Sequence, residues 1–241
     1  MLSDKDVLSS VMPDAAPNPE LMRSLGRLVR GLSALFWGLP TALVVCFHTA
    51  RADSLKTFGI VPPVICTGLL LYGIWHMSSF QKQERIWRKA LDRSLVLSLI
   101  NVGLSPFLYW WNKIPTNGFF LIMVILMTVS GLLFLASLNL VLQRLGAMLP
   151  DEGLRLETKQ FTALNLNLIG ATFVLCATYL VLSQLKTPPL YLQAVMIVLD
   201  RGSFWLLVLL VLLPMAMTMA LLWKTKEVIL DNVFGPKSPT Q

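Results

Sequence analysis

Hydrophobic residues in this 241-residue chain gather in six long runs separated by short polar stretches. A helix that crosses a membrane needs roughly 20 predominantly apolar residues. We place six such spans at 31–50, 58–77, 94–111, 118–142, 163–185 and 203–223. No Asp, Glu, Lys or Arg falls within these ranges. The pattern predicts an all-α protein, a polytopic six-transmembrane-helix bundle.

The polar stretches divide the rest of the chain. We expect a flexible polar tail over 1–17, an interfacial amphipathic helix over 18–30, the membrane domain over 31–223 and a cytoplasmic tail over 224–241. The 186–202 connection contains an apolar stretch too short to span the bilayer as a helix. We expect it to form an interfacial helix, with a lid or a partner-binding ledge as the alternative.

Residues 18–30 carry the signals of a helix start and of a two-faced helix. Asn18, Pro19 and Glu20 are of the types favoured at the cap, the first position and the first turn. Helical spacing then separates two faces, one with Leu21, Leu25 and Leu28, the other with Arg23, Arg27 and Arg30. A simple membrane anchor is the favoured interpretation of this helix, and docking of the arginine face to anionic lipid or to a partner is the alternative.

The composition supports the membrane assignment and suggests what the positive net charge binds. Hydrophobic residues make up 55% of the chain, charged residues make up 14%, and the mean hydropathy is +0.67. These values exclude a soluble globular domain, a disordered chain and a disulfide scaffold. The net charge is +7, and the basic residues flank the apolar runs. We therefore expect them to bind the anionic headgroups of the lipid bilayer, and we expect no nucleic acid as a partner. The 78–93 connection is the most basic one, and its Arg85 and Arg88 are further docking candidates.

The distribution of Lys and Arg predicts the orientation. Most of the 20 basic residues fall in 1–30, 78–93, 143–162 and 224–241. The opposite side of the predicted bundle holds Arg51, Lys56, Lys113, Lys186 and Arg201. Because basic residues accumulate on the cytoplasmic side, both termini are predicted to be cytoplasmic. No N-x-S/T sequence occurs, which fits a bacterial inner membrane.

Several chemistries have no residues to support them. Charge-coupled transport usually needs a carboxylate or a base at membrane depth, and the predicted spans contain none. His48 lies near the outer end of its predicted span and His76 near the cytoplasmic end of the next one. Most of the membrane thickness separates them, so one haem cannot use both. No histidine follows His76 that would activate a serine on a later helix. We therefore predict no enzyme activity, no catalytic residue, no cofactor and no metal site. Free thiols buried as small hydrophobes are expected at Cys46, Cys66 and Cys176.

Two stripes of small or polar residues stand out against the apolar background. On the third span the stripe consists of Ser94, Ser98, Asn101 and Ser105. On the fifth span it consists of Ala163, Asn167, Gly170, Ala171, Ala177 and Thr178. Small residues allow close helix packing and amides bond across helices, so both stripes are expected to face inward. The candidates for helix packing or for lining a path are Ser98, Asn101, Ser105, Asn139, Asn167 and Gly170.

These observations favour a non-enzymatic integral membrane subunit that packs against other membrane proteins and scaffolds or assembles a larger complex. The alternative is a passive channel or carrier for a small neutral or lipid-like solute. Its partners would be other integral membrane proteins or further copies of itself. A hydrated cavity bordered by Asn101 and Asn167 would favour the carrier, and amides sealed against neighbouring helices would favour the subunit.

Overall fold

The computed structural model describes residues 19–51, 57–80, 84–148, 152–183 and 190–234. Within these ranges the backbone alone is described at 19, 21, 154, 179–183, 190–208 and 232–234. The described chain is helical, with no strand in those ranges. The predicted tail at 1–17 and the last residues of the predicted cytoplasmic tail, 235–241, lie outside the described residues.

Seven helices follow one another along the described chain. They are α2 (Pro19–Arg51), α3 (Val61–Met77), α4 (Arg85–Leu104), α5 (Pro106–Lys113), α6 (Gly118–Met148), α7 (Glu152–Ser183) and α8 (Leu190–Phe234). Five stretches among the described residues are long and apolar enough to cross a membrane: Met22–Arg51, Arg85–Lys113, Gly118–Met148, Arg155–Thr178 and Leu209–Asp231. The remaining apolar helix, α3, has 17 residues. The prediction of an all-helical chain is therefore confirmed for the described residues, and the five long apolar stretches are consistent with a membrane protein.

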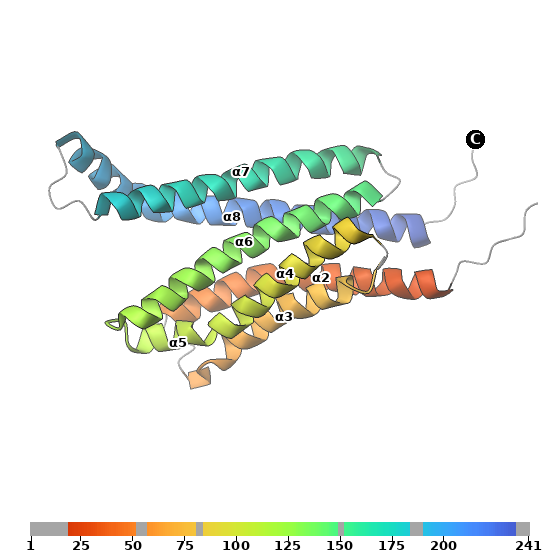
Figure 1. The fold of residues 1–241 in the computed structure, drawn as a ribbon, viewed down its shortest axis with the longest axis horizontal. Helices are drawn as coiled ribbons and strands as arrows, with labels where there is room; N and C mark the ends of the chain where they lie inside the picture. Colours follow the sequence, from red (N-terminus) through yellow and green to blue (C-terminus); the bar gives the residue numbers. More distant parts are fainter. Residues whose placement is uncertain (1–18, 52–56, 81–83, 149–151, 184–189, 235–241) are drawn as a thin grey trace, which may run out of the picture.

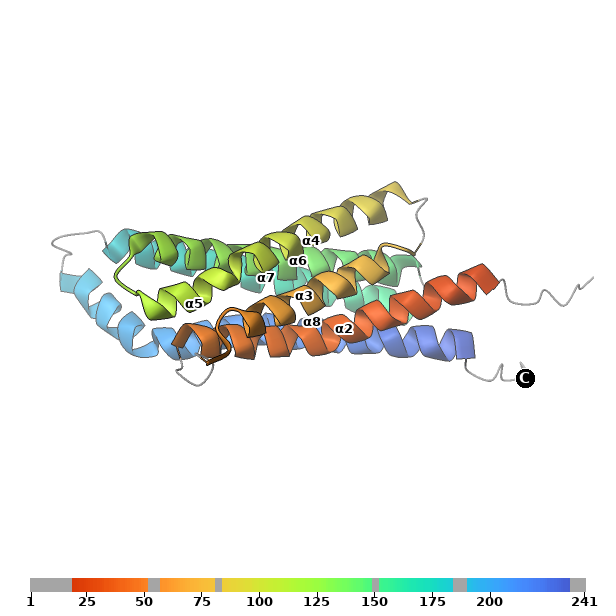
Figure 2. The same ribbon diagram turned by 90° about the horizontal axis from the view of Figure 1, so that it is seen from below.

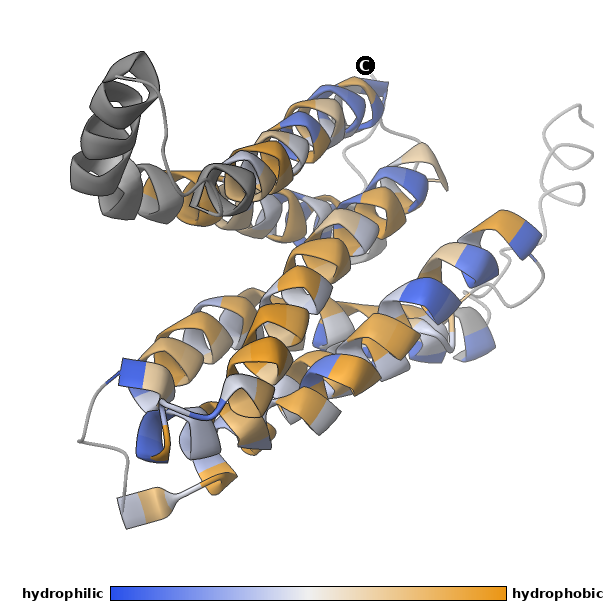
Figure 3. Cartoon of the chain, turned by 60° about the vertical axis from the view of Figure 1, so that its left-hand side comes forward, coloured by the Kyte–Doolittle hydropathy of each residue, from blue (hydrophilic) through white to orange (hydrophobic). Residues whose placement is uncertain are grey.

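The long helices run side by side along one axis and form an elongated bundle. α7 and α8 lie together on one side, α6 occupies the middle, and α2, α3 and α4 form the other side (Figures 1 and 2). α7 packs against α6 and α8, whereas α2 packs chiefly against α3 and also contacts α8. α2 begins and α8 ends at the same end of the bundle (Figure 1). Hydrophilic residues gather toward the ends of the helices and hydrophobic residues cover their middles (Figure 3).

Several helices continue past the apolar runs that predict them. Residues 19–30 form the first part of α2 and continue directly into the predicted span, in place of a separate interfacial helix. α7 begins at Glu152, which reduces the predicted 143–162 connection to residues 149–151 between α6 and α7. Hydropathy identifies only the segment that lies in the hydrocarbon. A helix can continue beyond that segment, because its polar side chains are hydrated there while its backbone keeps the same hydrogen bonds. At 33 residues, α2 is about 50 Å long, against about 30 Å of hydrocarbon.

The C-terminal part of the chain differs most from the prediction. Residues 190–202 of the predicted connection and the whole predicted span over 203–223 belong to a single helix, α8, which has 45 residues, whereas 186–189 lie outside the described residues. The same helix includes the first residues of the predicted cytoplasmic tail. No residue in 200–202 is a helix breaker strong enough to end it, since Gly202 costs only about 1 kcal/mol relative to alanine. The side chains that would test a lid or a ledge lie outside the described set.

A proline divides the predicted span at 94–111 into α4 and α5. Pro106 has no N–H to donate to the Val102 carbonyl one turn earlier. The Ser105 hydroxyl donates to that carbonyl instead, over 2.9 Å. The Ser105 N–H keeps its helical bond to the Asn101 carbonyl at 3.0 Å. The interruption is therefore a local break whose freed carbonyl has a replacement donor.

The apolar core runs through the bundle and is richest in leucine. Its fully buried members include Leu28, Leu32, Leu35, Ile74, Met77, Trp87, Leu138, Leu142, Leu145, Leu222 and Ile229. α2 and α3 approach most closely at two glycines, because a Cβ on Gly31 would lie 2.7 Å from the Gly73 carbonyl oxygen. Trp87 anchors the α3–α4 connection by donating from Nε1 to the Phe80 carbonyl at 3.1 Å.

Candidate functional site

The polar stripe of α4 is buried against α6. Ser94, Ser98, Asn101 and Ser105 have at most 5% of their surface exposed. The Ser94 and Ser137 hydroxyls share a hydrogen bond of 2.6 Å, and Ser130 donates to Asn101 Oδ1 over 2.6 Å. The structure therefore places this stripe inside the bundle, and two interhelical hydrogen bonds join it to α6.

A second polar cluster joins α6, α7 and α8. We call Asn139, Thr162, Asn165 and Thr218 the polar hub; each is at least 99% buried. Asn165 Nδ2 lies 3.0 Å from three acceptors, namely Asn139 Oδ1, the Pro214 carbonyl and Thr218 Oγ1. Asn139 Nδ2 donates to Thr218 Oγ1 at 2.8 Å, and Thr162 donates to the Asn139 carbonyl at 3.3 Å. The hub therefore fastens three helices at one level.

The predicted inward stripe of α7 faces outward, so that prediction was wrong. Its six members are all exposed, including Asn167 and Gly170, and a Cβ added to Gly170 would meet nothing within 4 Å. Two residues along a helix correspond to a turn of about 200°, which puts Asn165 and Asn167 on nearly opposite faces. Asn165 is the amide that finds partners, on both α6 and α8. The exposed stripe Ala163, Asn167, Gly170, Ala171, Ala177 and Thr178 is called the α7 outer face below.

The buried face of α7 was missed as a set, although its spacing is visible in the sequence. Its polar members are Thr158, Thr162, Asn165 and Thr172. These positions follow helical spacing and could have been compared with the stripe that contains Asn167. The comparison would not have decided between the faces, because each carries one amide. The face that carries Asn165 is the buried one because Asn139 and Thr218 on the neighbouring helices bond to Asn165.

The basic docking candidates are exposed at the end of the bundle where α2 and α4 begin (Figure 2). They are Arg23, Arg27 and Arg30 on α2, and Arg85 and Arg88 on α4. Arg85 and Arg88 also line an open hollow of about 450 Å³ with Lys89 and Asp92. At the same end, Lys224 of α8 forms an ion pair with Glu157 of α7.

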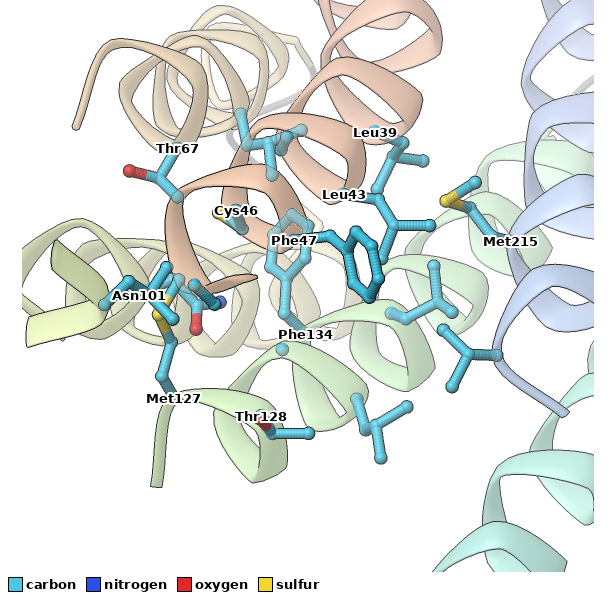
Figure 4. Close-up of a pocket in the computed structure, with 18 of the residues that line it drawn as sticks. Leu39, Leu43, Cys46, Phe47, Thr67, Asn101, Met127, Thr128, Phe134 and Met215 are labelled. Carbon is cyan, nitrogen blue, oxygen red and sulfur yellow. The ribbon is translucent and has the colours of Figure 1, made fainter. Parts of the chain in front are cut away.

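A largely apolar groove is bordered by α2, α6 and α8. It has a volume of about 330 Å³ and is also lined from α3, α4 and α5. Leu39 and Met215 lie toward one side of it, and Asn101, Cys46, Thr67 and Met127 toward the other (Figure 4). This cavity is called the groove below. Asn101 therefore belongs to the α4 stripe and also lines the groove.

The titratable and nucleophilic groups are dispersed. The described residues contain no group of three or more His, Cys, Asp and Glu that could hold a metal ion. His76 packs its ring 4.1 Å from that of Tyr72, near one end of α3, while His48 is exposed near the opposite end of α2. Ser130 bonds to a neutral amide. The Ser130–Asn101 bond joins α6 to α4, whereas the His76–Tyr72 contact lies within α3.

Comparison with protein families, with curated proteins and with solved structures finds no match to this chain.

Proposed function

We propose that this chain is a non-enzymatic integral membrane subunit that packs against another membrane protein through the α7 outer face. In this arrangement it crosses the membrane six times, with α3 as the shortest span and both termini in the cytoplasm. The observation that carries the proposal is the exposed amide of Asn167 within the predicted apolar span of α7.

The depth of Asn167 makes its exposure costly in a chain surrounded only by lipid. It is the fifth residue of the predicted span 163–185, about 6 Å from the first residue of that span, and it lies 8 residues, about 12 Å, after Lys159, the last charged residue before the span. Its amide has no hydrogen-bond partner among the described residues. Lipid chains cannot supply one, whereas a partner helix can.

The surroundings of Asn167 suit a helix as the partner. Gly170 and Ala171 follow it on the same face, and small residues let two backbones approach closely enough for an amide to bond across them. The exposed Val174 continues the same face and adds apolar contact area. A transmembrane helix of a second protein therefore fits both the shape and the chemistry.

The contacts give less support to a passive channel for a neutral polar solute. Such a path would need Asn101 and Asn167 on one hydrated cavity, whereas Asn101 lies inside the bundle and Asn167 outside it. The amides of the polar hub bond to neighbouring helices. A carrier for a lipid-like solute remains the second candidate, favoured by the groove.

The basic end of the bundle supports an orientation with that end in the cytoplasm. The exposed arginines at the starts of α2 and α4 lie together there, and cytoplasmic loops carry an excess of Lys and Arg. Anionic headgroups are the partner that this charge fits. A bacterial inner membrane is the location that we propose.

Site-specific crosslinking in native membranes tests the proposal. A photoreactive amino acid at Ala171 is expected to crosslink one discrete membrane protein, recovered in stoichiometric amount after mild detergent extraction. The same amino acid at Gly103, which is exposed on α4, serves as the matched control and is expected to give no such product. Asn167→Leu should weaken the association while the chain remains folded. Recovery of a monodisperse self-assembly alone, or an unchanged crosslink in Asn167→Leu, would contradict the proposal.

A further inference from the structure

Asn101 uses only part of its hydrogen-bonding capacity although it is 5% exposed. Its Oδ1 accepts from the Ser130 hydroxyl. Among the residues that the structure describes, none accepts a hydrogen bond from its Nδ2 amino group. Because the same side chain lines the groove, the amide presents a donor to an otherwise apolar cavity (Figure 4).

The Asn101–Ser130 bond engages the oxygen of the amide, and its length is consistent with this. The bond is 2.6 Å long. O–H···O bonds are typically about 2.7–2.8 Å and N–H···O bonds about 2.9–3.0 Å, so the short distance fits a hydroxyl donating to the amide oxygen. The amino group is therefore the side of the amide left without a partner.

The two hydroxyls of the groove already donate to backbone carbonyls, and the Cys46 thiol is only a weak hydrogen-bonding group. The hydroxyl of Thr67 donates to the Pro63 carbonyl at 2.7 Å, and that of Thr128 donates to the Val124 carbonyl at 2.9 Å. An occupant of the groove consequently meets apolar walls and one amide donor. A molecule that satisfies both needs a large apolar body and a hydrogen-bond acceptor.

The dimensions of the groove limit the occupant to one small molecule or one chain. The α2 lining extends from Leu39 to Ala50, which is about 16 Å of helix, or about half of the hydrocarbon thickness. The volume of about 330 Å³ is at the lower end of known ligand cavities. Phe47 is 51% exposed, so the groove opens sideways from the bundle and an occupant can enter from the membrane.

We propose that the groove binds a lipophilic carbonyl compound, whose carbonyl oxygen accepts a hydrogen bond from Asn101 Nδ2 and whose apolar body fills the space between α2, α6 and α8. The depth of Asn101 separates this ligand from an ordinary phospholipid. Asn101 is 8 residues from Arg93 and 12 from Lys113, the nearest charged residues on either side, or about 12 Å and 18 Å along the helices. Phospholipid ester groups lie near the headgroups, and a lipid tail has no acceptor, so a ketone or a quinone is the matching class.

Photolabelling of the purified full-length chain in micelles tests this proposal with benzophenone as the probe. Irradiated benzophenone reacts with a nearby C–H bond: its carbonyl carbon bonds to the side-chain carbon, and its oxygen takes the hydrogen. Met127 and Met215 line the groove, whereas Met148 lies outside it. Adducts mapped by mass spectrometry are expected on Met127 and Met215 and to be much rarer on Met148.

A pair of competitors measures the contribution of the carbonyl. Fluorenone and fluorene share one ring frame, but only fluorenone has an acceptor. Fluorenone should suppress the labelling at a concentration about three- to fifteen-fold lower than fluorene, the factor that one hydrogen bond gives inside a membrane protein. Asn101→Leu should abolish this preference. Ser130→Ala, which removes the same interhelical bond but keeps the amide, should retain it.

Two glycine variants test whether the groove is the site. Gly131 lines the groove, and a Cβ there would meet nothing within 4 Å, so Gly131→Leu fills the cavity without an initial clash. Gly103→Leu is the matched control, since Gly103 is an exposed helical glycine outside the groove. Labelling of Met127 and Met215 should be lost in the first variant and retained in the second. Equal competition by fluorene, no adducts at these methionines, or labelling unaffected by Gly131→Leu would each overturn the proposal.

Discussion

Two asparagines that are two positions apart on α7 should respond to the same substitution in opposite ways. Asn165 is fully buried in the polar hub, and Asn167 is exposed on the α7 outer face. Asn→Leu removes the amide from each while keeping a side chain of similar size. The pair therefore tests which face of α7 packs against the rest of the chain, with the helix propensity and the position along the helix nearly unchanged.

The expected magnitudes follow from the contacts. The two amide hydrogens of Asn165 serve three acceptors, so we count two hydrogen bonds at about 0.6 kcal/mol each. Asn139 Oδ1 then loses its donor, and a buried acceptor left unsatisfied costs about 1–3 kcal/mol. The substitution also removes Asn165 Oδ1, which is itself buried without a partner, and this gain offsets the loss at Asn139. Asn165→Leu should therefore lower the free energy of unfolding by about 1–2 kcal/mol. Asn167→Leu should change it by no more than about 0.5 kcal/mol, as is usual for exposed positions.

The assay is reversible unfolding of the isolated chain in mixed micelles, with increasing dodecyl sulfate and helix content followed by circular dichroism. If Asn165→Leu does not fold, Thr218→Val supplies a milder loss at the same hub, with an expected cost of about 1 kcal/mol. Equal unfolding midpoints for the two asparagine variants would refute the assignment of the buried face. A larger loss in Asn167→Leu would mean that α7 packs through the other face.

Two further predictions concern the helix crossing and the orientation. Gly73→Leu should destabilise the chain by about 1–3 kcal/mol in the same assay, because a Cβ there would lie 3.1 Å from the Gly31 carbonyl oxygen; a cost below about 0.5 kcal/mol would show that α2 and α3 do not approach this closely. In intact cells, a membrane-impermeant maleimide should label Thr116→Cys, which is exposed beyond α5, but not Ser78→Cys, which is exposed at the end of α3. Labelling with the opposite preference would reverse the proposed orientation.

The sequence is sufficient for the helices and for one of the two polar stripes. Apolar runs locate the segments that can cross a membrane because burial in hydrocarbon demands them. The α4 stripe is a clear case, since Ser94, Ser98, Asn101 and Ser105 are the polar side of an otherwise apolar helix and all four are buried. Helix ends are predicted less well. The starts of α4 and α7 are polar, and hydrated helix has no hydropathy signal that separates it from a loop.

The α7 error shows what a single helix cannot reveal. Both of its faces carry an asparagine, and small neighbours make the face of Asn167 look suited to packing. The choice is made by residues far along the chain, because Asn139 on α6 and Thr218 on α8 meet Asn165. The groove was missed for the same reason. Six helices contribute to it, and its shape depends on how their side chains meet.

The incompletely bonded amides of Asn101 and Asn167 imply two different kinds of occupant, because their surroundings differ in shape. Asn167 lies on a convex helix surface beside Gly170 and Ala171, where the backbone of a partner helix can approach closely over several turns. Asn101 lies in a concave groove of about 330 Å³, which is too small for a helix about 10 Å across over the same length. A helix can therefore satisfy Asn167 but not Asn101, and a small carbonyl compound can satisfy Asn101 without providing the contact area that the α7 outer face offers. The two proposals are therefore independent of each other. If Asn167→Leu loses the protein partner, the photolabelling of the groove should remain unchanged.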